Sequence, residues 1–221
     1  TLLIVAALDY IVPDQTALFK IGIAIALLLV LTFIALRGVE ASTAVLLFFA
    51  GITLAMILAI IVVGIFQINP ENYTPIFSPG QTPIIIFVAL FFIMESFNGW
   101  ESPTFMGGEV RNPQKIIPRS IMITTSIVAL LIIVFPAIFL GVIPSGTLIT
   151  LDTPVSTLAS VLFGPLGGDL VNIAIFLGLI GSAAGGIVST PRLILALAKD
   201  KLFIEQLSNV HPKLKTPSKA I

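Results

Sequence analysis

The stretch PIIIFVALFFIMESFNGWESPTFMGG, residues 83–108, begins as an apolar helix and turns polar halfway along. Its first half can lie in lipid, because about 20 mainly apolar residues cross a hydrocarbon core of ~30 Å. Its second half brings two carboxylates, Glu95 and Glu101, toward the middle of the membrane. Each ionised group there costs at least ~2.5–3.5 kcal/mol. Such groups need protonation or a cavity lined by water or protein, so they indicate a functional site.

The same stretch carries a helix breaker at its centre. Asn98-Gly99 is a turn dipeptide, and Pro103 cannot donate a backbone proton inside the helix. A helix broken there leaves backbone N–H and C=O groups unpaired in hydrocarbon, and a bound substrate or ion can supply their partners. The alternative is a continuous, kinked helix in which both carboxylates serve packing alone.

The composition of the whole chain favours an integral membrane protein. Of 221 residues, 57% are hydrophobic and 10% are charged, against about 25% charged in a soluble domain. The absence of Cys excludes thiolate metal sites, and a single His, His211, excludes a cluster of His ligands. Eleven basic residues balance eleven acidic ones, which gives no basis for binding nucleic acid. We expect no catalytic residue, no metal site and no resident cofactor.

Five stretches are long enough to span a membrane, and one shorter stretch looks like the end of a truncated helix. The five are residues 17–36, 41–66, 83–108, 119–143 and 166–198, and the short one is 1–12. Between them we predict loops at 37–40, 67–82, 109–118 and 144–165, and a polar tail over 199–221. Inside 144–165, Asp152 or Thr153 can cap a short helix over 155–163. We interpret the chain as an internal piece of a longer protein.

The basic residues sort to one side of these spans. Alternating crossings place nine of them on one face and only Lys20 on the other, with Arg192 inside its helix near the basic face. Because positive loops stay in the cytoplasm, 37–40, 109–118 and 199–221 are predicted to be cytoplasmic, and 67–82 and 144–165 extracellular. The nine are Arg37, Arg111, Lys115, Arg119, Lys199, Lys201, Lys213, Lys215 and Lys219.

The last span offers a second candidate site. Small residues from Gly178 to Gly186 give it a smooth face on which another helix can approach closely. Hydroxyls at Ser182 and Ser189 could coordinate a cation. The alternative, in which these hydroxyls bond carbonyls of their own helix, is at least as well supported.

Three motifs resemble amino acid permeases of the amino acid–polyamine–organocation (APC) superfamily. The first runs from Gly99-Trp100-Glu101-Ser102 through Gly108-Glu109-Val110-Arg111-Asn112-Pro113 to Ile117-Pro118-Arg119. The second runs from Gly181-Ser182 through Ser189-Thr190-Pro191-Arg192 to His211-Pro212-Lys213. The third is Arg37-Gly38-Val39. Their order and spacing cover almost the whole chain.

The resemblance implies part of a LeuT-like fold with two inverted repeats of five helices. Residues 1–66 would supply the end of helix three and helices four and five. Residues 67–82 would be an extracellular loop. Residues 83–221 would supply helices six to eight and a cytoplasmic loop. Helices one and two, which share the substrate site in this family, are missing from the chain and would be its partners.

The resemblance also implies roles for individual residues. The unwound segment would comprise Phe97, Asn98 and Gly99, whose carbonyls would receive the substrate ammonium, and Glu101 matches an acidic position near the gate. Ser182 and Ser189 lie where sodium-coupled relatives face their cation. The substrate-binding set is therefore expected to be Glu95, Ser96, Phe97, Asn98, Gly99, Trp100 and Glu101.

Two departures from the family pattern bear on substrate and coupling. Relatives often place an aromatic lid where this chain has Glu95, which raises the odds of a cationic substrate. Proton-coupled relatives can carry a Lys near the position of Thr53, and 41–66 contains none. Sodium coupling, exchange and a carboxylate proton relay stay open.

The sequence thus predicts a secondary active transporter of amino acids or related amines in the cell membrane, working by alternating access. A polyamine or cationic amino acid exchanger of the same superfamily is one alternative. A truncated, non-transporting membrane subunit is another. An intramembrane enzyme is disfavoured, because the chain has no G-x-S-x-G, no H-E-x-x-H and no paired intramembrane Asp. The oligomeric state is open.

Overall fold

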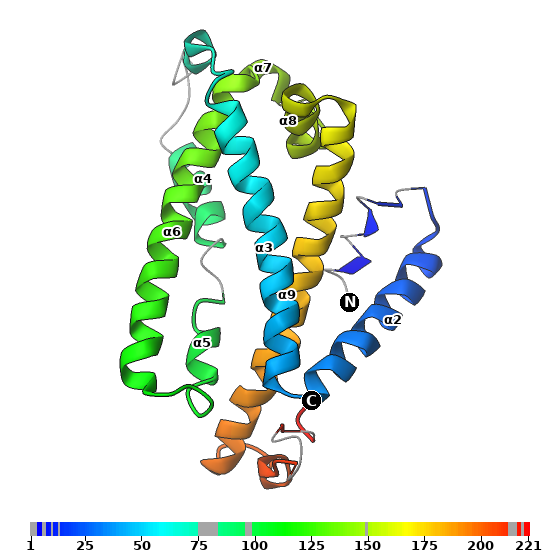
Figure 1. Cartoon of the computed structure of the whole chain (residues 1–221), viewed down its shortest axis with the longest axis vertical. Helices are drawn as coiled ribbons and strands as arrows, with labels where there is room; N and C mark the ends of the chain where they lie inside the picture. The colour runs from blue at the N-terminus through cyan, green and yellow to red at the C-terminus, as the bar shows by residue number, and fades with distance from the viewer. Residues whose placement is uncertain are drawn as a thin grey trace.

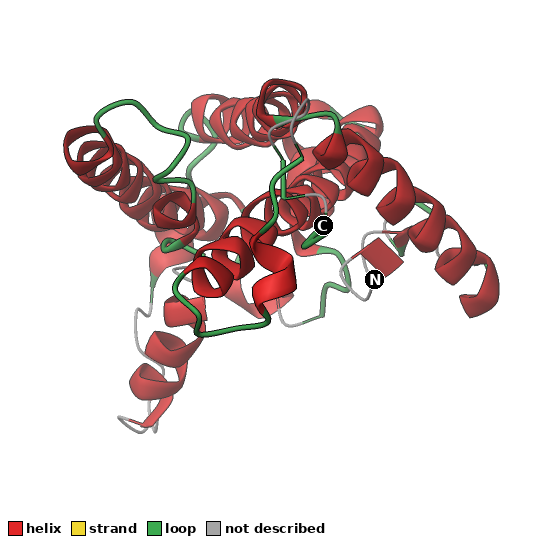
Figure 2. Ribbon diagram, turned by 90° about the horizontal axis from the view of Figure 1, so that it is seen from below, coloured by secondary structure: helices red, strands yellow, loops and turns green. Residues whose placement is uncertain are grey.

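The structure, a computed structural model, is helical throughout the part of the chain that it describes. That part is residues 4–221 without 6, 7, 10, 13, 75–83, 96–98, 149, 212–215 and 218. It contains helices and loops but no strand, which confirms the all-α prediction (Figures 1 and 2). The elements are α2 (Ala17–Leu36), α3 (Val39–Gly64), η1 (Pro70–Tyr73), α4 (Ile84–Glu95), α5 (Ser102–Phe105), α6 (Pro113–Val142), α7 (Ser145–Leu148), α8 (Pro154–Phe163), α9 (Pro165–Lys199) and η2 (Glu205–Ser208).

Among the described residues, four helices are long and apolar enough to cross a membrane. They are α2, the Ser42–Gly64 part of α3, α6 and α9. They match four predicted spans to within a few residues, and they make the chain part of a multi-pass membrane protein. The fifth predicted span, 83–108, is divided into α4 and α5. The predicted helix over 1–12 lies partly outside the described residues, and the inverted repeat and the count of five full spans stay predictions.

One predicted loop is shorter than expected. The prediction of a loop over 109–118 is wrong for residues 113–118, because α6 already begins at Pro113. Proline suits the first helical position, where its missing N–H would have no partner in the helix. Pro118 then costs a single backbone bond, and its fixed φ is compatible with a helix. Two smaller errors are of the same kind. Val39 and Glu40 lie in a predicted loop but belong to α3, and Lys199 lies in the predicted tail but belongs to α9.

The predicted basic segments lie at one end of the bundle. The turn between α2 and α3, the turn before α6 and the end of α9 are together at the bottom of Figure 1. The segment with η1, and α7 and α8, lie at the opposite end. The alternation of the chain between two ends therefore agrees with the sorting of positive charge.

Helices α3 and α9 pack closely, because glycines on α9 face side chains of α3. A Cβ added at Gly181 would lie 2.6 Å from the Cβ of Phe49, and one at Gly178 would lie 2.8 Å from the Oγ1 of Thr53. The Thr53 hydroxyl donates to the Phe49 carbonyl at 3.0 Å. It therefore brings no unpaired polar group into the interface. The small-residue face of α9 is thus a helix-packing surface.

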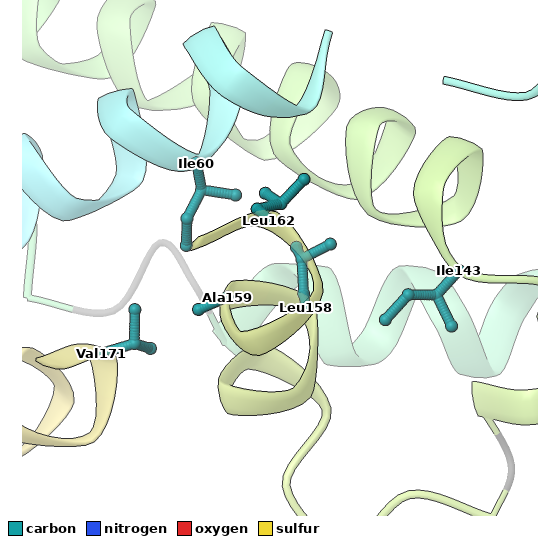
Figure 3. Packing of buried hydrophobic residues seen from close by; sticks show 6 residues of the cluster. All are labelled: Ile60, Ile143, Leu158, Ala159, Leu162 and Val171. Atoms are coloured by element: carbon teal, nitrogen blue, oxygen red, sulfur yellow. The ribbon is translucent and has the colours of Figure 1, made fainter. Parts of the chain in front are cut away.

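A compact apolar core holds the end of the bundle that carries α8. Six buried residues from α3, α8, α9 and the end of α6 meet there, as Figure 3 shows. Glycines allow this approach: a Cβ at Gly167 of α9 would lie 2.6 Å from the Ala159 carbonyl oxygen of α8. The six are Ile60, Ile143, Leu158, Ala159, Leu162 and Val171.

The segment that follows α3 is fastened to the end of α6. The Gly141 carbonyl accepts from the Asn69 backbone N–H at 2.9 Å and from Asn72 Nδ2 at 2.7 Å. The Tyr73 hydroxyl donates to the Ala137 carbonyl at 2.8 Å. Gly141 carries no side chain where Tyr73 lies against it. The Gly141 carbonyl is one of the last four of α6, which have no partner inside the helix, so these bonds satisfy it.

We predict that Gly181→Ala destabilises the bundle. The added methyl forces Phe49 of α3 to move, and overpacking of this kind costs ~1–3 kcal/mol. The measurement is the thermal unfolding midpoint of the detergent-solubilised full-length protein. Gly186→Ala on the same helix is the control, because a Cβ there has no atom within 4 Å. Equal midpoints for the two variants would contradict close packing of α3 on α9.

Candidate functional site

A cavity of about 730 Å³ lies between α3, α5, α6 and α9. Its wall brings together residues that the sequence indicated separately, namely Gly99 near the predicted break and Ser182 and Ser189 of α9. The rest of the wall is mainly apolar, and Leu46, Met106 and Ile117 belong to it. Its polar side chains are Thr43, Ser102, Glu109, Ser120, Ser182 and Ser189.

The helical path is interrupted beside this cavity. Helix α4 ends at Glu95 and α5 begins at Ser102, with a turn at residues 99–101. Gly99 has a φ of 92°, a left-handed conformation that glycine adopts without a steric penalty. The Gly99 carbonyl accepts from the Ser102 N–H at 3.0 Å, and the Glu101 carbonyl accepts from the Thr104 N–H at 2.8 Å. The described residues therefore support an interruption in place of one continuous helix over 83–108.

The structure places only some of the predicted substrate-binding residues. Gly99 lies in the cavity wall, whereas Trp100 is half-buried and Glu101 is exposed. Glu95 is the last residue of α4, and its side chain lies outside the described part. Predictions for three further residues also fall outside the described chain: Ser96, Phe97 and Asn98.

The two α9 hydroxyls differ in their surroundings. Ser189 is buried and donates to the Gly185 carbonyl at 2.9 Å, as the own-helix alternative predicts. Ser182 is exposed in the cavity wall one turn after Gly178. Within the described ranges no three His, Cys, Asp or Glu residues lie close enough to hold a metal ion. Cation binding by Ser182 and Ser189 stays a prediction.

An ion pair at the end of the cavity was not predicted from the sequence. Arg192 Nε of α9 lies 3.1 Å from Oε1 and 3.2 Å from Oε2 of Glu109, in the turn between α5 and α6. The Arg192 side chain is 3% exposed and that of Glu109 is 26% exposed. Arg192 Nη1 also donates to the Val188 carbonyl of its own helix. The pair therefore joins α9 to the α5–α6 turn.

The guanidinium of this pair is incompletely satisfied. Arg192 Nη2 is buried and has no hydrogen-bond partner among the described residues. A buried donor without a partner costs ~1–3 kcal/mol, and more when it is charged. The sequence signal for this pair was a charged residue inside a span, which always needs a partner. The partner itself is 83 residues away, and sequence spacing alone does not identify it.

Comparison with known proteins places the chain in one family. The family model described as amino acid permease matches residues 2–221. The chain is 31% identical to the serine/threonine exchanger SteT of Bacillus subtilis (strain 168), over 75% of this chain and 38% of that protein. It is 28% identical to the methylthioribose transporter of the same organism, over 91% of this chain and 43% of that protein.

A third relative has a similar relation to the chain. The branched-chain amino acid permease BcaP of Bacillus subtilis (strain 168) is 26% identical over 88% of this chain and 41% of that protein. The chain thus spans about two fifths of the length of these relatives. All three relatives are named as transporters, exchangers or permeases, and none as an enzyme. Since the family match extends over nearly the whole sequence, the chain belongs to the amino acid permease family.

Proposed function

We propose that the protein containing this chain is a secondary active transporter of amino acids or related amines in the cell membrane. The observation that carries this proposal is the cavity of about 730 Å³, in which an interrupted helix meets the hydroxyl-bearing face of α9. Small-molecule sites are typically clefts of ~300–1,000 Å³ with a few placed polar groups in an apolar wall. Family membership supports the same assignment.

The substrate is held, in this proposal, at the interruption between α4 and α5. The Gly99 carbonyl uses one lone pair for the Ser102 N–H, and the second lone pair stays available for a substrate ammonium. The carbonyls of Phe97 and Asn98 add to the same acceptor set. Helices one and two of the full-length protein supply the rest of the site. Alternating access follows as one repeat rocks against the other around this point.

The carboxylates set charge preference or couple protons. A carboxylate at Glu95, in place of an aromatic lid, favours a cationic amino acid or a polyamine as the second candidate substrate class. Exchange is a further possibility in line with the name of the SteT relative. The basic end of the bundle, with the α2–α3 turn, the turn before α6 and the tail after α9, faces the cytoplasm.

The test of this function is uptake by the full-length protein in proteoliposomes. Radiolabelled neutral, cationic and branched-chain amino acids and a polyamine are supplied with and without a sodium gradient, a pH gradient and internal amino acid. Saturable uptake of at least one substrate supports the proposal, and the gradient that drives it names the coupling. Absence of uptake for all of them would favour a non-transporting subunit.

We predict that Glu101→Gln lowers uptake of a cationic substrate about tenfold, the factor that a loss of ~1.4 kcal/mol produces. The neutral amide keeps the shape of the side chain and removes a negative charge next to the turn at Gly99. Initial uptake rate against substrate concentration is the measurement, with membrane insertion checked by immunoblot. Glu71→Gln in η1 at the opposite end is the control for loss of an exposed carboxylate. Unchanged kinetics for Glu101→Gln would exclude this role.

We predict that Gly99→Ala reduces uptake while the protein still folds. A Cβ at Gly99 meets no atom within 4 Å, so the substitution tests the left-handed backbone and not the space around it. The strain is of order 1–3 kcal/mol. Gly108→Ala is the matched control, because its Cβ also meets nothing within 4 Å and no positive φ is involved. Equal uptake by both variants would count against a role for the turn.

A further inference from the structure

We propose that the Arg192–Glu109 ion pair is a latch that closes the end of the cavity beside the basic face. This inference rests on the proposed function, since a latch has a role only if the cavity opens alternately to the two sides. It assigns a conformational role to a pair of side chains lying one turn beyond the predicted ion-binding hydroxyl of Ser189.

The position of the ion pair allows it to hold the cavity closed at the end beside the basic face. Glu109 is itself part of the cavity wall, and so are Val188 and Ser189, which lie in the turn of α9 just before Arg192. The pair bridges the wall formed by α9 and the wall formed by α5 and the turn after it. Opening the cavity at this end requires these two walls to separate, and the two charges then have to part.

The element that the pair holds is short. Helix α5 has four residues, and the turn at residues 99–101 separates it from α4. The segment from Gly99 to Asn112 therefore moves more freely than a continuous helix would, unless a tertiary contact fixes it. The charge-assisted contact of Glu109 with Arg192 is such a contact, and it lies at the end of the segment away from the interruption.

The free energy of the ion pair favours a contact that forms and breaks over one that only stabilises the fold. A buried pair adds stability only when the remaining donors and acceptors are satisfied, and Arg192 Nη2 has no partner among the residues that the structure describes. Separation of the walls would admit water, which can hydrate this nitrogen and the Glu109 carboxylate. The closed state thus gains the ion pair and the open state gains hydration, so the two states can lie close in free energy.

The test measures how fast a thiol reagent reaches the cavity from the basic face. The chain contains no Cys, so Ser189→Cys on α9 and Ser102→Cys on α5 are single reporters once cysteines elsewhere in the full-length protein are replaced by serine. Inside-out vesicles expose the basic face to a membrane-impermeant methanethiosulfonate. The labelling rate is compared between the intact pair, Arg192→Gln, Glu109→Gln, the doubly neutral variant and the charge-reversed pair Arg192→Glu with Glu109→Arg.

A latch predicts that each neutral variant raises the labelling rate about tenfold, equivalent to a shift of ~1.4 kcal/mol toward the open state. The charge-reversed pair should return the rate to within about twofold of the intact pair. Lys115→Gln, which removes an exposed charge from the start of α6 at the same end, should leave the rate unchanged. The doubly neutral variant keeps the test decisive if a single variant does not fold, because it leaves no unpaired charge behind.

A labelling rate in the neutral variants equal to that of the intact pair would overturn the proposal. A charge-reversed pair with the same labelling rate as the neutral variants would also overturn it. A lower unfolding midpoint without faster labelling would show that the pair only stabilises the fold, and this result would also overturn the proposal. Labelling requires no substrate, so the two proposals can fail separately. Faster labelling in a protein without any uptake would show that the pair controls access to the cavity, and it would reject transport. Normal uptake with unchanged labelling would support transport and reject the latch.

Discussion

The pairing of backbone polar groups in a medium without water is the constraint on which this structure depends. In hydrocarbon each N–H and C=O must find a partner within the protein, which permits long helices and penalises every break. Helices α2, α3, α6 and α9 meet the constraint mostly with bonds inside each helix, apart from the bonds lost at Pro118, Pro136 and Pro191. Residues 99–101 form a turn in place of a helix, and this turn occurs where a polar-edged cavity adjoins Gly99. The described turn within the predicted span 83–108 thus lies beside the space that could hold a ligand.

The packing divides the described chain into a firm part and a lightly held part. Helices α3, α8 and α9 share close contacts through glycines and a buried apolar cluster. Helix α4 has every described side chain from Ile84 to Met94 exposed, and α5 is a single turn. Since stability follows buried apolar contact, the region of α4 and α5 is the part that can rearrange at least cost. The cavity and the Arg192–Glu109 ion pair lie where the two parts meet.

Sequence reasoning located four of the five predicted spans, because hydropathy and length decide them with little help from tertiary contacts. It failed at residues 113–118, where two prolines indicated a loop, although Pro113 suits the first position of α6 and Pro118 is tolerated inside the helix at the loss of one backbone bond. It left the Ser189 hydroxyl open between two interpretations, and the bond to Gly185 supports the local one. It gave Arg192 no partner, because the contact with Glu109 depends on how α5 and α9 are brought together, and nothing in local spacing encodes that arrangement.

The hydrogen bonds around Gly141 have a mechanical consequence for the opposite end of the molecule. Asn69, Asn72 and Tyr73 tether the far tip of α6 to the segment that leaves α3. Hydrogen bonds at one end of a helix oppose its sliding along neighbouring helices more than they oppose its rotation about that end. We therefore expect a displacement of α6 relative to α9 to be smallest beside Tyr73 and to increase over the thirty residues of the helix toward Pro113.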